Sequence, residues 1–145
     1  MADFSHLNVL EVTQDKTARY TLHQITVNGK TPTLIVAPAT EANRPYFNAL
    51  LKRAGKSAKA IRAGAINAGM VEDNRDEDKD LYPRFIIQGW EDMIDATGKD
   101  TAFSKTECVD FLDQLPSWIF DDLRQFCGNP ANYTELMDVE ISAGN

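Results

Sequence analysis

The hydrophobic and polar positions at the start of the chain predict a β-hairpin preceded by a polar arm. Residues 1–18 are polar and weakly patterned, which is typical of a flexible N-terminal arm. Residues 19–25 alternate as a β-strand does, and residues 33–37 are rich in β-branched side chains. Asn28 and Gly29 lie between them and favour a two-residue turn, because both tolerate positive φ. We therefore expect the two strands to pair as an antiparallel hairpin.

Helical spacing follows the hairpin. Apolar residues recur at i, i+3, i+4 and i+7, which predicts a helix with one apolar face. That face consists of Phe47, Leu50, Leu51 and Ala54. Thr40 or Asn43 is expected to cap this helix, and Gly55 is expected to end it. A second, Ala-rich helix is then expected over residues 57–68, with Ser57 as its cap.

The middle of the chain is strongly charged and then apolar. Residues 71–80 are the most charged stretch, either a linker or an acidic helix start with Pro83 in the first turn. Residues 85–90 form an apolar run too short to assign by periodicity, so helix and strand both remain open. Residues 95–99, Asp-Ala-Thr-Gly-Lys, predict a turn.

The C-terminal part predicts three more helices. Ser104 and Glu107 form a capping-box pattern that starts the first helix, and Pro116 ends it. Ser117 is expected to cap the second helix, and Asn132 a last short one. The apolar positions of the first two are Cys108, Phe111, Leu112 and Leu115, then Ile119, Phe120, Leu123, Phe126 and Cys127.

Together these elements predict an α+β fold, with an N-terminal antiparallel β-hairpin or small sheet followed by a mainly α-helical body. The 145 residues suit one domain. We divide the chain into a flexible arm (1–18), a hairpin with two helices (19–70), and an acidic joint with a helical C-terminal lobe (71–145). The last two segments form either one continuous domain or two lobes.

Charge is distributed unevenly around a net charge of −7. Residues 1–70 hold nine Lys/Arg and four Asp/Glu, whereas residues 71–145 hold six and eighteen. The basic residues cluster at Lys52, Arg53, Lys56, Lys59 and Arg62. This cluster is either a phosphate-binding patch or a solvated helix surface facing the acidic half of the chain. We favour the second interpretation and expect no nucleic-acid binding, because no aromatic or Gly-rich signature lies among these charges.

Composition limits the class of protein. No apolar run approaches the roughly 20 residues of a membrane span, and the first residues lack the basic and apolar regions of a secretory signal. Two cysteines cannot form a disulfide framework. We therefore expect a soluble cytoplasmic protein that does not bind membranes.

The sequence contains neither a complete calcium-binding loop nor a zinc-binding pattern. Asp76, Asp78 and Asp80 have the 1, 3, 5 spacing of a calcium loop, but Leu81 and Ile87 occupy the positions that require Gly and Glu. We therefore expect these carboxylates to be solvated. A zinc site is not expected either, because His6, His23, Cys108 and Cys127 are widely separated.

No catalytic signature is present. The sequence lacks a nucleophile elbow, a cysteine-protease motif, a P-loop and a dinucleotide-binding turn. Asp121 and Asp122 are adjacent, but 22 acidic residues produce such pairs by chance. The cysteines fall on apolar faces, where a free thiol behaves as a small buried hydrophobe. We expect no enzyme activity, no catalytic residue, no metal and no cofactor.

Aromatic residues are frequent in the C-terminal half, where most are expected to build the core. Some are candidates for partner contacts, because Trp and Tyr often anchor binding surfaces. Our candidate partner-binding residues are Trp90, Trp118, Phe120 and Tyr133. Trp118 is the preferred exposed anchor, because one of the adjacent apolar residues 118–120 must point away from the main helix face.

Several of these segments occur in an order that is also found in a known protein family. The hairpin turn is followed by a Gly-Trp … Asp-Ala-Thr-Gly-Lys … Phe-Ser stretch over residues 89–104, then by Leu-Pro-Ser-Trp-Ile-Phe and Asn-Pro-Ala-Asn-Tyr. This arrangement resembles the tail assembly chaperones of long-tailed bacteriophages. The resemblance covers residues 19–135 and is closest over residues 85–133. Its motifs are turns, caps and aromatic residues, so it carries no specific binding residues with it.

The resemblance implies a non-enzymatic chaperone that binds the phage tape measure protein, keeps it soluble and helps to recruit tail tube protein. Such a protein acts in the host bacterial cytoplasm and is absent from the mature virion. The alternatives are a virion structural protein, either a head–tail joining or a minor tail component, and a nucleic-acid-binding protein that uses residues 52–62. Self-association remains open.

Overall fold

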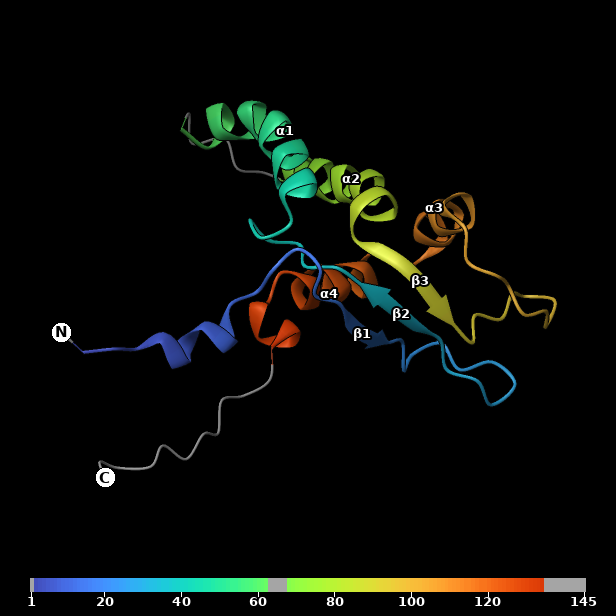
Figure 1. Cartoon of the computed structure of the whole chain (residues 1–145). Helices are drawn as coiled ribbons and strands as arrows, with labels where there is room; N and C mark the ends of the chain where they lie inside the picture. The colour runs from blue at the N-terminus through green and yellow to red at the C-terminus, as the bar shows by residue number, and fades with distance from the viewer. Residues whose placement is uncertain (1, 63–67, 135–145) are drawn as a thin grey trace, which may run out of the picture.

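The computed structural model describes residues 2–62 and 68–134, and it confirms the α+β fold (Figure 1). The sheet has three antiparallel strands in the order β1-β2-β3. The elements are η1 (Ser5–Leu10), β1 (Ala18–Thr21), β2 (Thr33–Val36), α1 (Arg44–Arg62), α2 (Ala68–Phe85), β3 (Ile87–Glu91), α3 (Lys105–Gln114), α4 (Ser117–Cys127) and η2 (Pro130–Tyr133). Part of the predicted N-terminal arm thus forms the 3₁₀ helix η1.

The predicted hairpin turn is confirmed, although β1 is shorter than expected. Asn28 and Gly29 have φ values of 53° and 76°, and a bridge between Val27 and Lys30 closes the turn. Strand β1 ends at Thr21 because the residue opposite the next position is Pro32, which has no N–H to donate to the ladder. The chain from residue 22 to residue 25 forms a turn instead.

A β-bulge sets the register of β3. Leu34 lies opposite Trp90 and Val36 opposite Ile87, so Gln88 is the extra residue in β3. Without this extra residue the two apolar side chains of β3 would point to opposite faces, because side chains alternate along a strand. The bulge thus places Ile87 and Trp90 on the same face as the buried residues of β2. It also settles the open assignment of residues 85–90, since Phe85 ends α2 and the strand follows.

Helix α1 corrects one prediction. It passes through Gly55 and Ser57 without a break, so the predicted helix end and the second helix start are both wrong. A glycine inside a helix costs only about 1 kcal/mol relative to alanine, and the flanking residues are good helix formers. Residues 63–67 at the end of the predicted second helix lie outside the described chain. Asn43 acts at the cap as expected, because its side-chain oxygen accepts from the Tyr46 N–H at 3.5 Å.

The charged stretch 71–80 lies within α2, and Pro83 lies near the C-terminal end of that helix. The expectation that Pro83 occupies a first turn is therefore wrong. A proline so close to the helix end removes one backbone hydrogen bond in a helix that ends two residues later. Figure 1 shows α1 and α2 side by side as a helical hairpin that projects from the sheet.

The capping predictions for the C-terminal helices are confirmed in part. Ser104 Oγ accepts from the Glu107 N–H at 3.0 Å, as the capping box requires. Ser117 is not a cap, because Pro116 occupies that position and its carbonyl accepts from the following turn. Asn129, rather than Asn132, caps η2. The part of the last predicted helix beyond residue 134 lies outside the described chain.

The core lies between the sheet and helices α2, α3 and α4. Ring contacts join these elements: Tyr20 of β1 packs on Phe126 of α4, and Tyr82 of α2 packs edge-on against Phe120 of α4. The predicted apolar faces of α3 and α4 are confirmed, with Cys108, Leu112, Leu115, Ile119, Phe120, Leu123 and Cys127 all buried. The predicted face of α1 is partly wrong, because Leu51 is exposed and Tyr46 is buried instead.

A buried ion pair joins three helices. The carboxylate of Asp78 in α2 is 8% exposed and accepts from Arg124 Nε of α4 at 2.7 Å and from the Tyr46 hydroxyl of α1 at 3.0 Å. Arg75 makes a two-point contact with Asp121 at 3.0 and 2.7 Å, and this contact holds the pKa of Asp121 below its ordinary value. The expectation that Asp78 is solvated is therefore wrong.

Replacing Arg124 with Met should lower the free energy of unfolding by about 3 kcal/mol or more, because Asp78 would remain buried without its cation. Adding Asp78→Asn to this variant should recover part of the loss, since the two residues interact directly. Urea denaturation followed by circular dichroism measures both effects. Arg19→Met is the control, because the Arg19–Glu91 pair is exposed and should contribute little. Equal losses for the two arginine variants would contradict the anchoring role of Arg124.

The two cysteines should be unreactive in the folded protein. Burial raises the pKa of the Cys108 and Cys127 thiols to about 12, so only about one thiol in ten thousand is ionised at pH 8. A disulfide reagent such as DTNB should therefore react slowly with the native chain and should titrate both thiols in urea. Rapid reaction of either thiol under native conditions would show that the core is more open than described here.

Candidate functional site

A groove of about 490 Å³ lies between the loop after β3 and helix α3. We call it the β3–α3 groove. Most of its walls are apolar or aromatic, and a smaller number of polar residues stand among them. The apolar lining residues are Ile25, Trp90, Met93, Ile94, Ala96, Phe111, Leu115, Pro116 and Ile119, and the polar ones are Gln24, Asp95, Thr101, Glu107, Asp110 and Gln114.

Trp90 fixes one wall of this groove. Its indole N–H donates to the Thr101 carbonyl at 2.8 Å, and its ring packs edge-on against Phe103 and Phe111 at centroid distances of 5.0 and 5.7 Å. The bulge in β3 is what turns this indole towards α3. The wall therefore depends on packing against α3 and on contacts with the loop that leads into α3.

The loop after β3 is held by its own hydrogen bonds. The Asp95 carboxylate accepts from the Thr97 hydroxyl at 2.6 Å and from the Lys99 N–H at 3.0 Å. These bonds, that of the Thr97 hydroxyl first, lower the pKa of Asp95. Gly98 closes the turn with φ of 86°, which confirms the turn predicted over residues 95–99. This conformation keeps Ile94 and Ala96 at the edge of the groove.

The rim of the groove is negative. Three of its lining residues are acidic, and none is Lys or Arg. The Asp95 carboxylate accepts hydrogen bonds within the turn, whereas the Glu107 and Asp110 side chains are exposed on α3. The two carboxylates are three residues apart, so they lie on the same side of that helix.

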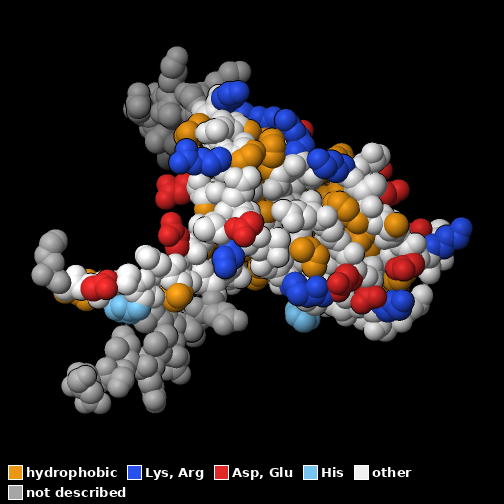
Figure 2. Space-filling view, viewed as in Figure 1, with side chains coloured by type: hydrophobic (Ala, Val, Ile, Leu, Met, Phe, Trp, Pro, Cys, Tyr) orange, Lys and Arg blue, Asp and Glu red, His pale blue; other side chains and the backbone are white. Residues whose placement is uncertain are grey.

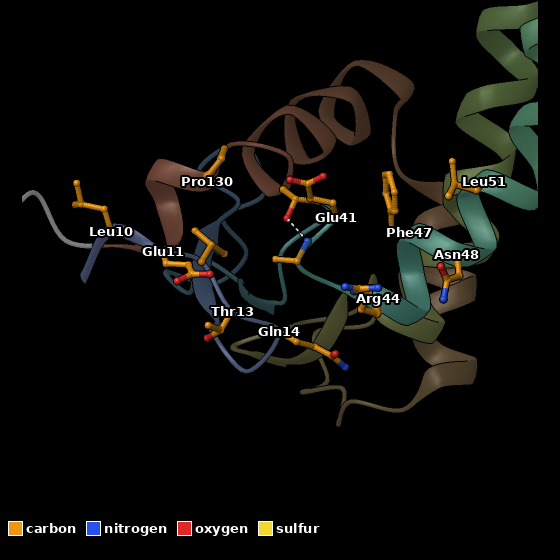
Figure 3. A pocket seen from close by; sticks show the side chains of 13 residues that line it. Leu10, Glu11, Thr13, Gln14, Glu41, Arg44, Phe47, Asn48, Leu51 and Pro130 are labelled. Atoms are coloured by element: carbon orange, nitrogen blue, oxygen red, sulfur yellow. Dashed lines mark hydrogen bonds between the residues drawn. The ribbon is translucent and has the colours of Figure 1, made fainter. Parts of the chain in front are cut away.

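A second hollow of about 870 Å³ lies between the N-terminal arm and the start of α1, and it is visible as a concavity in Figure 2. In Figure 3, Phe47 and Leu51 of α1 lie on one side of this space, and Leu10 and Pro130 lie on the other. Helix η1, which ends at Leu10, buries none of its side chains. On the arm side of the hollow Val12 packs against the core, but Leu10 is exposed at the end of η1. More lining residues of the β3–α3 groove belong to the core, so that groove is the better formed of the two sites.

The structure places the four predicted partner-binding residues in different surroundings. Trp90 lines the β3–α3 groove, and Trp118 is 63% exposed at the start of α4. Phe120 is fully buried, and Tyr133 is buried with its hydroxyl donating to the Ala37 carbonyl at 2.8 Å. The four side chains do not form one surface, and the last two belong to the core.

Sequence reasoning missed most of the groove. Met93 and Ile94 come from a loop, where apolar periodicity gives no signal, and Ile25 falls in the predicted strand 19–25 but lies beyond the end of β1. The helical spacing of apolar residues did identify Phe111, but it indicated a core position on a helix and not a position in a groove. Only the pairing of β3 with β2 shows that these residues surround one space.

The described residues contain no arrangement suited to a metal: no three His, Cys, Asp or Glu side chains in that part of the chain are placed to share one. His23 is exposed, and it lies just after β1, outside the strand. Asp121 is bound to Arg75 and Arg124, and Asp122 accepts from the Tyr20 hydroxyl at 2.5 Å. These carboxylates therefore support the fold.

At Arg53, the basic cluster of α1 contacts the acidic helix α2. Arg53 pairs with Asp80 of α2 and also donates to the Glu77 carbonyl at 3.3 Å. The interpretation as a helix surface that faces the acidic half is thus confirmed at Arg53. Lys52 is exposed, and the side chains of the other three basic residues lie outside the described part of the chain.

A comparison with protein-family models places the chain in a known family. A family model described as YdaY prophage protein matches residues 41–142, which include α1, α2, β3, α3 and α4. No curated protein and no solved structure shows significant similarity. Among the helices in the described ranges, none has the length and apolar character that a membrane span requires. Because the matched region covers most of the sequence, the chain is of phage origin and belongs to the YdaY prophage protein family.

Proposed function

We propose that this protein is a non-enzymatic tail assembly chaperone, which holds a helical segment of the phage tape measure protein in the β3–α3 groove. The observation that carries the proposal is the groove itself, an apolar channel whose walls are anchored in the core. Membership of a prophage protein family supports the phage context. The resemblance of residues 85–133 to tail assembly chaperones supplies the partner.

The groove has the chemistry that helix-in-groove recognition needs. An amphipathic helix inserts side chains spaced i, i+3 or i+4, and i+7 into an apolar cleft. Trp90 and Phe111 offer flat apolar surfaces, and Met93 provides an unbranched side chain that adapts to different partners. The remaining acidic surface would keep the chaperone soluble while the groove is empty.

The proposal of a non-enzymatic role agrees with the state of the reactive side chains. Both thiols are buried and have a pKa of about 12, so they are poor nucleophiles at neutral pH. The carboxylates nearest to the core are bound by arginines or by a tyrosine hydroxyl. The surface offers a partner an apolar groove and acidic side chains.

The proposal includes the further steps that the resemblance implies. The chaperone would act in the host cytoplasm, recruit tail tube protein to the tape measure protein, and leave before the virion is complete. Recruitment requires a second contact surface. Trp118 is a candidate for it, because its side chain is exposed and Trp118 directly precedes Ile119, a lining residue of the groove, in the sequence.

A virion structural protein is the second candidate, and one observation favours it. Helix η1 and the residue before it expose four large apolar side chains, with Phe4 at 64%, and such side chains often mark contacts between subunits. The four are Phe4, Leu7, Val9 and Leu10. Mass spectrometry of purified particles separates the candidates, since a stoichiometric amount of this chain in virions would contradict a transient chaperone.

Co-expression with the tape measure protein of the same prophage should raise the soluble fraction of that protein. Ala96→Trp should abolish at least half of the gain, because Ala96 is exposed at the groove and the added indole would block it without removing a core contact. Ala131→Trp is the matched control, since Ala131 is also exposed, lies on η2 and does not line the groove.

Soluble tape measure protein is measured by centrifugation and quantitative blotting, with circular dichroism to show that both variants fold. If wild-type chain gives no gain, the chaperone function is wrong. If both Trp variants behave as wild type, the function stands but the partner binds elsewhere.

A further inference from the structure

Two acidic side chains at the β3–α3 groove have no partner. Within the described residues, the carboxylates of Glu107 and Asp110 make neither an ion pair nor a hydrogen bond, and both side chains are exposed. Some acidic residues elsewhere in the described fold are matched by arginines, as at Asp78, Asp80 and Glu91. The groove therefore carries negative charge that the folded chain does not neutralise.

This charge lies beside the apolar channel. Glu107 and Asp110 project from α3, one helical turn apart, and Phe111 from the same helix forms part of the apolar lining. A helix lying in the channel would have its apolar stripe against Phe111 and Trp90 and the flank of that stripe near the two carboxylates. Lysine or arginine at this flank would gain attraction, and glutamate or aspartate would be repelled.

We propose that the β3–α3 groove selects a basic amphipathic helix, in which an apolar stripe is bordered by Lys or Arg. This inference rests on the proposed function, since it assigns a charge to the partner helix that the groove is proposed to hold. Attraction between exposed charges acts mainly on the rate of encounter and on discrimination between partners. A groove with this rim would thus choose among the many apolar helices of an infected cell.

Charge also argues against a second copy of this chain as the occupant. The chain has a net charge of −7, so two copies repel each other. The basic residues that could offset this repulsion are concentrated on α1, where Arg53 is already paired with Asp80 of α2. A basic helix from another protein fits the rim better than any acidic surface of the same molecule.

Three fluorescein-labelled peptides of about 18 residues test the proposal. They share one apolar stripe and differ only in the bordering residues, which are Lys, Gln or Glu. By fluorescence anisotropy at low salt, the Lys peptide should bind the full chain about tenfold more tightly than the Gln peptide, and the Glu peptide should bind most weakly. The advantage of the Lys peptide should fall as NaCl rises from about 50 to about 500 mM.

Neutralising the rim should remove this preference. The double variant Glu107→Gln and Asp110→Asn should bind the Lys and Gln peptides with similar affinity. Asp113→Asn is the matched control, because Asp113 is an exposed acid on the same helix that does not line the groove. This control should retain the preference of the wild type. A Trp118→Phe background leaves Trp90 as the sole tryptophan, so a change in its emission reports binding in the groove.

Equal affinities for the Lys and Gln peptides, with a Trp90 response to both, would overturn the charge preference and leave helix binding intact. Binding of no peptide would overturn the assignment of the groove to a helix. Sedimentation that shows a dimer, lost on Ala96→Trp, would identify a second copy as the occupant and would also overturn the proposal.

Discussion

The ion pair between Asp78 and Arg124 is the contact on which the arrangement of the elements depends. It joins α2 to α4, and the Tyr46 hydroxyl adds α1 to the same carboxylate. A buried charge pair is stabilising only when its geometry is good and its other hydrogen bonds are made, and both conditions hold here. Because β3 begins directly after α2, fixing α2 against α4 also fixes where β3 enters the sheet. These polar contacts add to the shared hydrophobic core in holding the helical hairpin and the sheet together.

The β3–α3 groove follows from this constraint. Once α2 is held, the bulge at Gln88 brings Ile87 and Trp90 to the inner face of the sheet. Ile87 is buried at the start of β3, whereas Trp90 lies near its end and is half-buried against α3. The loop that returns to α3 satisfies its own polar groups through Asp95 and Trp90, so it need not close over the apolar space. The groove can remain open because these hydrogen-bonding groups of the surrounding loop already have partners.

Sequence reasoning succeeded where one residue determines local geometry and failed where two distant segments decide. The turn at Asn28 and Gly29 and the cap at Ser104 are local, and both were predicted correctly. The burial of Asp78 depends on other helices and was missed, and so was the passage of α1 through Gly55, where one glycine costs a helix only about 1 kcal/mol. The candidate site shows the same division. Trp90 could be named because its residue type is suggestive, but Phe120 and Tyr133 have equally suggestive side chains that the fold buries.

The acidic side chains of the second half of the chain fall into two groups. Asp78 and Asp121 are bound by Arg124 and Arg75, and Asp80 by Arg53, so their charges belong to the fold. The carboxylates of α3 have no such partners within the described chain and add nothing to its cohesion. Uncompensated like charge weakens a compact state, so its presence along one side of an apolar groove favours a role towards another molecule. The same surface that keeps the empty groove soluble would then also determine which helix enters it.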